Sequence, residues 1–255
     1  MTTWSHTSTD SAPCIDADGN EYSTVKLGRQ EWMTENLKTT KYNDGSDIER
    51  VTSSSDWSAL STGARCEYSN DTDNSDIYGY LYNRMAVETD KLAPNGWRVP
   101  ILNDYKELER YLGMSAADSD VYTGGTERGT DEGSELAGRA DLWDDDDLES
   151  NSNFGTSGFN ALPAGRRPWN TGTFYNINTD AYFWTTTELS WLTAESYIRW
   201  IQHDHDDLHA GSGRKQNGYS VRCIRNEVSP WSAKYPELKW HTWGTESTDF
   251  WQEWG

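Results

Sequence analysis

The sequence predicts a single α+β domain built mainly of short antiparallel strands and long loops, with one or two helices packed against them. Its 255 residues include 14 Trp, 14 Tyr and 21 Gly, while its mean hydropathy is only −0.91. Large aromatic side chains combined with many glycine turns are typical of β-rich domains rather than helical bundles. Several segments alternate apolar and polar residues as half-buried strands do, and one segment has clear helical periodicity. A chain of this length can bury its core as one domain.

The first structured element is predicted to be a hairpin. In the stretch CIDADGNEYSTVKL, residues 15–17 predict one strand and residues 22–27 predict the returning strand. The Asp-Gly-Asn sequence between them is typical of a turn that needs positive φ. A calcium loop formed by Asp16, Asp18 and Asn20 is the alternative. It lacks a glutamate at the twelfth position, so the turn is favoured.

The clearest predicted helix lies in LAPNGWRVPILNDYKELERYLG, residues 92–113. A Pro-Asn-Gly turn and a short strand at residues 97–99 precede it, and Asn103 is predicted to cap its first turn. Apolar side chains then recur at helical spacing, and Gly113 is placed to end the helix. These apolar positions are Tyr105, Leu108, Tyr111 and Leu112.

The segments on either side of this helix are predicted to be mostly loop. Residues 38–76 contain only a short strand near residues 64–68, and residues 76–87 predict a short helix or strand. After the helix the chain is acidic and glycine-rich up to residue 153. The WDDDD run at residues 143–147 is predicted to be a solvated loop, with calcium binding as the alternative.

The C-terminal part is predicted to be a series of strands. GFNALPAGRR (residues 158–167) predicts a buried strand followed by a glycine turn, and residues 171–188 predict two strands joined by a tight Asn-Thr-Asp turn. Residues 195–202 and 218–226 alternate as further strands. Residues 203–213 are then predicted to be the loop that connects these last two strands.

Charge and hydropathy exclude several classes of function. The net charge of −20 and the pI of about 4.5 argue against binding to nucleic acids or to anionic membranes, which need a basic surface. No apolar segment reaches the length of a transmembrane helix. The first residues, MTTWSHTSTDSAPC, lack the basic and apolar regions of a signal peptide. We therefore expect no nucleic-acid partner and no membrane insertion, while the compartment stays open.

Three cysteines, Cys14, Cys66 and Cys223, stand without CxxC spacing. An odd number of separated cysteines indicates neither a disulfide framework nor a zinc site. We predict three buried thiols, with one disulfide as the alternative.

The two ends of the chain differ in composition from the rest. Residues 1–13 are polar and rich in Ser and Thr, which predicts an arm. Residues 227–255 contain five Trp, too high an aromatic content for a disordered tail. We expect this extension to pack on the domain or on another subunit, so an oligomer formed through it stays open.

The stretch IQHDHDDLHAGSG, residues 201–213, contains three of the five histidines beside three aspartates. His203, His205 and His209 could form a zinc site if the chain folded back near residues 207–208. No neighbouring pattern supplies the carboxylates that orient such ligands, and no nucleophile motif accompanies a catalytic His–Asp pair. We therefore predict a surface stretch and no metal or cofactor, with a structural calcium as the alternative.

Several segments occur in the order found in one known family. They are DADGNEYSTVKLGRQEWMTENLKTTKYNDG, YGYLYNRMAV, LAPNGWRVPILNDYKELERYLG, GFNALPAGRR, GTFYNINTDAYFWTTTE and KQNGYSVRCIRN. Together they resemble the Fibrobacter succinogenes major paralogous domain, a branch of the C-type-lectin fold. The resemblance implies one C-type-lectin-like domain over residues 14–226, with a small twisted antiparallel sheet and long irregular loops. It also implies a framework role for Trp32, Trp97, Trp184, Gly218, Arg222 and Cys223.

The same fold is used by variable proteins of diversity-generating retroelements, which rewrite a C-terminal stretch of a binding protein. The resemblance implies that a corresponding stretch of this chain forms a variable, ligand-binding face. Ala210 stands where the family often has Arg, which leaves open how the local loop is held. The implied face consists of Tyr182, Leu189, Ser190, Trp191, Tyr197, Trp200, Gln202, His203, Asp204, His205, Asp206, Asp207, His209, Gly211, Ser212 and Asn217.

The function implied by this resemblance is that of a receptor or adhesion protein of a virus or microbe rather than an enzyme. Its partner would be a protein or glycan on a host or neighbouring cell, and display on a virion or cell surface is favoured. Rigid Tyr and Trp anchors beside adaptable Ser, Gly, Asp and His contacts are typical of binding surfaces. A structural surface or virion component is the alternative. An oxidase of the formylglycine-generating type would need a cysteine pair, which only Cys66 and Cys223 could supply.

Overall fold

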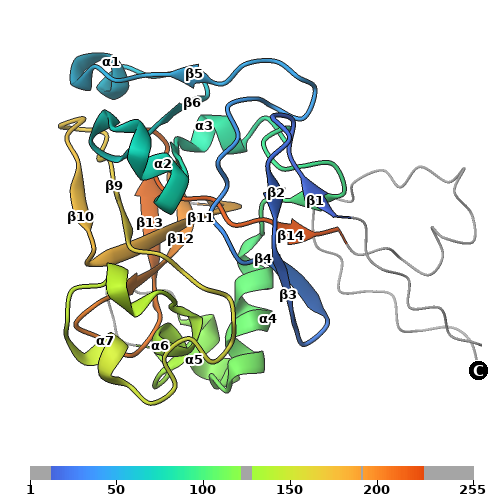
Figure 1. The fold of residues 1–255 in the computed structure, drawn as a ribbon, viewed down its shortest axis with the longest axis vertical. Helices are drawn as coiled ribbons and strands as arrows, with labels where there is room; N and C mark the ends of the chain where they lie inside the picture. Colours follow the sequence, from blue (N-terminus) through green and yellow to red (C-terminus); the bar gives the residue numbers. More distant parts are fainter. Residues whose placement is uncertain (1–12, 122–127, 191, 227–255) are drawn as a thin grey trace, which may run out of the picture.

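The structure is a computed structural model that describes residues 13–121, 128–190 and 192–226 (Figure 1). Small β-sheets and short helices are combined in these residues, so the fold is α+β as predicted. The predicted Trp-rich extension and nearly all of the predicted arm lie outside the described residues. Within the described part, no helix has both the length and the apolar character needed to cross a membrane.

A five-stranded sheet lies at the centre of the molecule, with the strand order β10–β9–β11–β12–β13 (Figure 1). β11 and β12 form its longest hairpin, in which Tyr182 lies opposite Trp200 and Trp184 lies opposite Ile198. β9 is parallel to β11, and it separates β11 from β10. The strands are β9 (Ala164–Arg166), β10 (Tyr175–Ile177), β11 (Asp180–Leu189), β12 (Leu192–Gln202) and β13 (His209–Arg214).

The last strand of this sheet corrects the prediction for the C-terminal part. Residues 203–208 form turns and bends, and β13 begins directly after them, at His209, and pairs antiparallel with β12. The predicted strand at residues 218–226 is reduced to isolated bridges and the two residues of β14 (Ile224–Arg225). Glycine, alanine and serine make up most of β13. These residues have low strand propensity, so the sequence did not predict this strand.

Two hairpins, rather than the single one predicted, occupy the N-terminal part. β1 (Cys14–Ile15) pairs with β2 (Glu21–Tyr22), and β3 (Thr24–Leu27) pairs with β4 (Gln30–Met33). The turn between β1 and β2 forms as predicted. The Asp16 carboxylate there accepts hydrogen bonds from the Asp18 and Asn20 backbone N–H groups and from the Tyr22 hydroxyl.

The chain also returns to pair with these hairpins. β14 lies between β4 and β8 (Trp97–Arg98) in a four-stranded sheet. A third sheet contains β5 (Glu49–Arg50), β6 (Ala64–Cys66) and β7 (Leu81–Tyr82), of which β6 confirms the strand predicted near residues 64–68.

The helices are short except for α4 (Leu102–Leu112), which confirms the clearest predicted helix. Gly113 ends it with a φ of 122°, as predicted, but Asn103 does not cap it. The cap residue is Ile101, whose backbone N–H donates to the Asp104 carboxylate at 2.7 Å, so the helix begins earlier. The other helices are α1 (Ser54–Ser58), η1 (Tyr68–Asn70), α2 (Thr72–Tyr78), α3 (Arg84–Val87), α5 (Ala116–Asp120), α6 (Glu132–Leu136), η2 (Ala140–Leu142) and α7 (Asp147–Ser150).

Large aromatic rings fill the core on both faces of the central sheet. Trp184 lies in the hydrophobic cluster on one face, and Trp32 and Phe183 lie in the cluster on the other. The residues for which the resemblance implies a framework role are all buried. Arg222, the charged member of this set, donates its guanidinium hydrogens to backbone carbonyls and the Asn36 side chain.

Candidate functional site

One face of the central sheet carries a row of stacked rings, which we call the aromatic row: Tyr219, Tyr182, Trp200, His209 and His205. Strand pairing places Tyr182, Trp200 and His209 side by side, because each lies opposite the next in register. The ring centroids of Trp200 and His209 are 5.1 Å apart with nearly parallel planes, and those of Tyr182 and Tyr219 are also 5.1 Å apart. Trp200 is half-buried, so the row reaches the surface at this ring.

The opposite face of the same strands is closed by α4. Arg199 of β12 projects from that face and forms a buried ion pair with Glu109 of α4, which also binds Arg128 at 2.6 Å. All three side chains are almost completely inaccessible to water. This face is therefore closed. The face that carries the aromatic row is also largely buried, and Trp200 and His205 are the half-buried rings at which it can meet a ligand.

His209 lies buried within the row, and neither of its ring nitrogens forms a hydrogen bond with a described residue. Burial lowers the pKa of His209, although the Asp207 carboxylate, 3.4 Å from its Nε2, opposes this effect. His205 packs edge-on against His209, whereas His203 points towards Asp146 at 3.9 Å. Nowhere in the described residues do three His, Cys, Asp or Glu side chains come together as metal ligands would.

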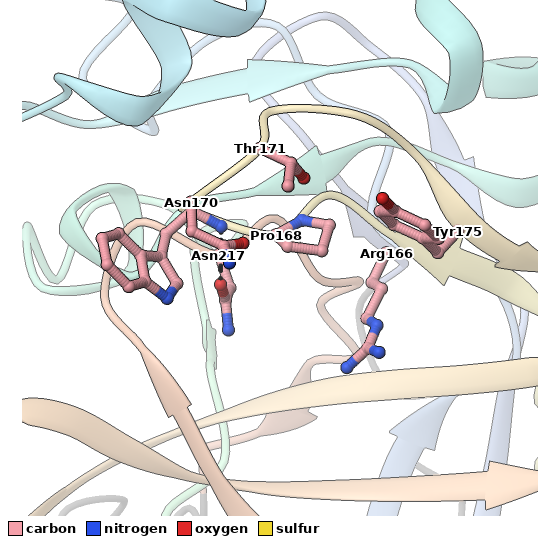
Figure 2. Close-up of a pocket in the computed structure, with 7 residues that line it drawn as sticks. Arg166, Pro168, Asn170, Thr171, Tyr175 and Asn217 are labelled. Atoms are coloured by element: carbon pink, nitrogen blue, oxygen red, sulfur yellow. Dashed lines mark hydrogen bonds between the residues drawn. The ribbon is translucent and has the colours of Figure 1, made fainter.

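A cavity of about 360 Å³ adjoins the aromatic row (Figure 2). Arg166 connects the two, because its guanidinium carbon lies 5.2 Å from the centre of the Tyr182 ring. Asn217 also connects them: its amide nitrogen donates to the Tyr219 hydroxyl, and its oxygen accepts from the Trp169 backbone. The lining residues are Arg166, Pro168, Trp169, Asn170, Thr171, Tyr175 and Asn217.

The structure brings together only some of the residues that the resemblance assigned to the variable face. The aromatic row and its cavity bring together Tyr182, Trp200, His205, His209 and Asn217. Ser190 lies instead at the far end of the 11-residue β12, about 36 Å away in strand length from the turn that contains His203.

Their exposure also differs widely. Ser190 and Asp204 are exposed, and Trp191 lies outside the described residues. The buried members are Tyr182, Leu189, Asp207, His209, Gly211 and Asn217, and the half-buried members are Tyr197, Trp200, Gln202, His203, His205, Asp206 and Ser212.

Of the residues that line the cavity, sequence reasoning indicated only Asn217, and it missed the three largest side chains: Arg166, Trp169 and Tyr175. Trp169 and Tyr175 are 37% and 44% exposed, although rings of this size usually pack inside. The stretch RRPWNTGTFY sets them among proline, asparagine and glycine, which form loops. Aromatic residues within such a loop were the available signal.

The three cysteines are free and buried, as predicted. Burial raises the pKa of both Cys14 and Cys66 to about 12 and holds the pKa of Cys223 well above its usual value. Cys66 and Cys223 also belong to different hydrophobic clusters. These thiols therefore stay protonated and unreactive at neutral pH.

The family model described as the Fibrobacter succinogenes major domain matches residues 25–225, and this match decides the family. The chain belongs to the Fibrobacter succinogenes major domain family. Its aromatic row and the adjoining cavity both lie inside the matched residues of this Fibrobacter succinogenes major domain. No curated protein and no solved structure matches the chain.

Proposed function

We propose that this protein is a ligand-binding module of the receptor or adhesion type, built on a C-type-lectin-like scaffold. The observation that supports the proposal best is the aromatic row that reaches the surface at Trp200 and continues into the cavity beside Arg166. Half-exposed aromatic rings anchor partners at low entropic cost, and concave sites with a few polar groups are typical of ligand pockets. The partner is a protein or a glycan.

A diversified surface is the finer form of this proposal. Buried positions in a close-packed core accept few side chains, so we expect variation at the exposed and half-buried positions alone. These are Ser190, Tyr197, Trp200, Gln202, His203, Asp204, His205, Asp206 and Ser212.

Sequencing the gene locus in several isolates tests whether these positions vary. A diversity-generating retroelement predicts a near-copy of the codons for about residues 182–226 beside a reverse transcriptase. A gene that is identical in all isolates, with no such copy, would contradict it.

Binding through the aromatic row can be tested with the full chain immobilised on glycan and host-surface protein arrays. For any partner captured, Trp200→Ser and His205→Ser should each weaken binding by about tenfold or more, because anchor side chains dominate interface energy. The control is Tyr111→Ser, which removes a 55% exposed ring on α4, away from the row. Equal losses of binding in Trp200→Ser, His205→Ser and Tyr111→Ser would contradict the proposal. Unchanged binding in all three variants would contradict it as well.

We propose no catalytic role for this protein. The three thiols, which an oxidase of the formylglycine-generating type would need as thiolates, are buried and protonated. His209 has a lowered pKa, but it contacts Trp200 and His205 rather than a nucleophile.

A further inference from the structure

Ten of the 14 arginines of this acidic protein form ion pairs with its own carboxylates. Four are exceptions: Arg166, Arg167, Arg214 and Arg222. Two of these, Arg167 and Arg222, are buried and donate to backbone carbonyls. The arginines in ion pairs are Arg29, Arg50, Arg65, Arg84, Arg98, Arg110, Arg128, Arg139, Arg199 and Arg225.

The two remaining arginines, Arg166 and Arg214, lie at the same place. Arg166 lines the 360 Å³ cavity, and the Arg214 guanidinium lies 4.5 Å from the ring centre of Trp169, which also lines it. Neither forms an ion pair with any carboxylate in the described part of the chain. The Nε of Arg166 is also buried without a hydrogen-bond acceptor among the described residues. The Arg166 guanidinium at the cavity therefore has no carboxylate bound to it among the described residues.

Two carboxylates lie nearby, but neither forms an ion pair with Arg166 or Arg214. They are Asp180 and Glu195, which act electrostatically on Tyr182 and Tyr219, and Glu195 lies opposite Arg214 in the sheet register. The Asp180 carboxylate accepts a hydrogen bond from the Tyr182 hydroxyl at 2.5 Å, and Glu195 accepts one from a serine hydroxyl.

A second cavity provides a contrast. It measures about 220 Å³ and is lined by Arg29, Arg98 and Arg225. Each of these arginines pairs with a carboxylate of the protein, as in the bidentate contact of Arg225 with Glu31 at 2.7 and 3.0 Å. The arginines at this smaller cavity thus have carboxylate partners, whereas Arg166 at the larger cavity has none among the described residues.

The rest of the larger cavity defines the shape of its ligand. Trp169 and Tyr175 present broad ring surfaces at the rim, while Asn170 and Thr171 supply neutral amide and hydroxyl groups. Figure 2 shows Thr171, Asn217 and Arg166 arranged around the open space. Its volume is near the lower end of the range for small-ligand pockets, about 300–1,000 Å³. Flat apolar surfaces, neutral hydrogen-bonding groups and a guanidinium fork match a compact ring that bears hydroxyls and one carboxylate.

We propose that this cavity binds a carboxylate-bearing sugar unit of an acidic glycan, such as a hexuronate. The carboxylate binds Arg166, the ring packs on Trp169 or Tyr175, and Asn170 and Thr171 meet the hydroxyls. This proposal rests on the proposed binding function, because the cavity continues from the aromatic row, and it names the ligand class of that cavity. Residues 166–175 lie outside the stretch expected to vary, whereas Asn217 lies within it.

Calorimetric titration of the full chain with D-glucuronate and with D-glucose tests the proposal. The two sugars differ only in the carboxylate, so glucuronate should bind about tenfold or more tightly than glucose. Arg166→Gln should remove this preference. Tyr175→Ala, which changes an exposed rim residue and leaves the fold intact, should weaken binding of both sugars. The control is Arg139→Gln, an exposed arginine paired with Asp141, and it should bind glucuronate as the unaltered protein does.

Several outcomes would overturn the proposal. Equal affinity for glucose and glucuronate would exclude a carboxylate site, as would unchanged binding in Arg166→Gln. If acetate or phosphate bound as tightly as glucuronate, the cavity would be a general anion site. Tighter binding of an N-acetylated, C-amidated Gly-Glu-Gly peptide would make it a site for acidic peptides. If partner capture on the arrays is lost in Trp200→Ser but kept in Arg166→Gln, and glucose and glucuronate bind equally, the sugar site fails while the proposed partner-binding surface stands. The two failures can therefore be told apart.

Discussion

His209 is held in the fold as a neutral imidazole. Burial lowers its pKa below the value of about 6.5 that histidine has in an unfolded chain. A group whose pKa is lowered by folding contributes stability above its unfolded pKa and loses that contribution as the pH falls through the folded value. The free energy of unfolding should therefore decrease as the pH drops below about 6.5.

Urea unfolding between pH 7.5 and pH 5 measures this effect. His209→Gln should flatten the decrease below about pH 6.5, because the titrating group is gone. His203→Gln is the matched control, since His203 is half-buried at the neighbouring turn and should keep the pH dependence. A curve that is unchanged in His209→Gln would contradict this prediction, because groups other than His209 would then carry the dependence.

At the scale of single elements, α4 offers a direct comparison of buried and exposed charge. Glu109 binds two buried arginines on the inner side of this helix, and Glu107 binds the exposed Arg29 on its outer side. Removing the charge of Glu109 would leave two guanidinium groups buried without a counterion. Glu109→Gln should therefore lower the free energy of unfolding by about 3–5 kcal/mol.

Glu107→Gln, on the same helix, is the control. Arg29 is 78% exposed, so this ion pair is screened by water and its loss should cost at most about 1 kcal/mol. Chemical denaturation at neutral pH measures both variants. Similar losses in the two would indicate that water reaches the Glu109 cluster.

How far the sequence predicted these elements depended on residue size. α4, β11 and β12 have long, strongly periodic apolar patterns, and all three were predicted. β13 consists mostly of small residues, and the sequence predicted a loop there. In the structure, Gly213 of this strand leaves room for the Tyr219 ring to pack against it. A Cβ at Gly213 would lie 2.5 Å from that ring. The short helices α1 and α2 were also not predicted, because they have too few turns for a periodic pattern.

The sequence predicted only part of the candidate site. The resemblance indicated Tyr182, Trp200 and Asn217, which line the row or its cavity, but it placed them with Ser190, at the other end of β12. Arg166 was not predicted, because its significance lies in the absence of an ion pair with any described carboxylate. Such an absence depends on how distant segments pack, and no local pattern encodes it.

At the scale of the whole molecule, the net charge of −20 opposes compactness. Salt screens this self-repulsion over the Debye length, so added NaCl should stabilise the fold. Raising NaCl from about 10 mM to about 300 mM should raise the unfolding temperature by about 2–4 °C, which corresponds to roughly 1 kcal/mol for a domain of this size. Scanning calorimetry at neutral pH measures the shift.

The same scan near the pI of about 4.5 is the control, since the net charge vanishes there and the salt effect should shrink with it. A lower unfolding temperature in salt at neutral pH would mean that the ion pairs contribute more to stability than self-repulsion removes from it.

The described chain enters and leaves the fold on one side of the molecule, with consequences for how the domain can be tethered. β1 and β14 lie on the side opposite β9 and β10, which flank the cavity (Figure 1), and Cys14 and Cys223 belong to one hydrophobic cluster. A biotin, a fluorophore or a carrier protein joined beside Pro13 or beside Asn226 should therefore leave the cavity open. Attachment at either of these two positions would place the carrier on the side of the described residues away from the cavity.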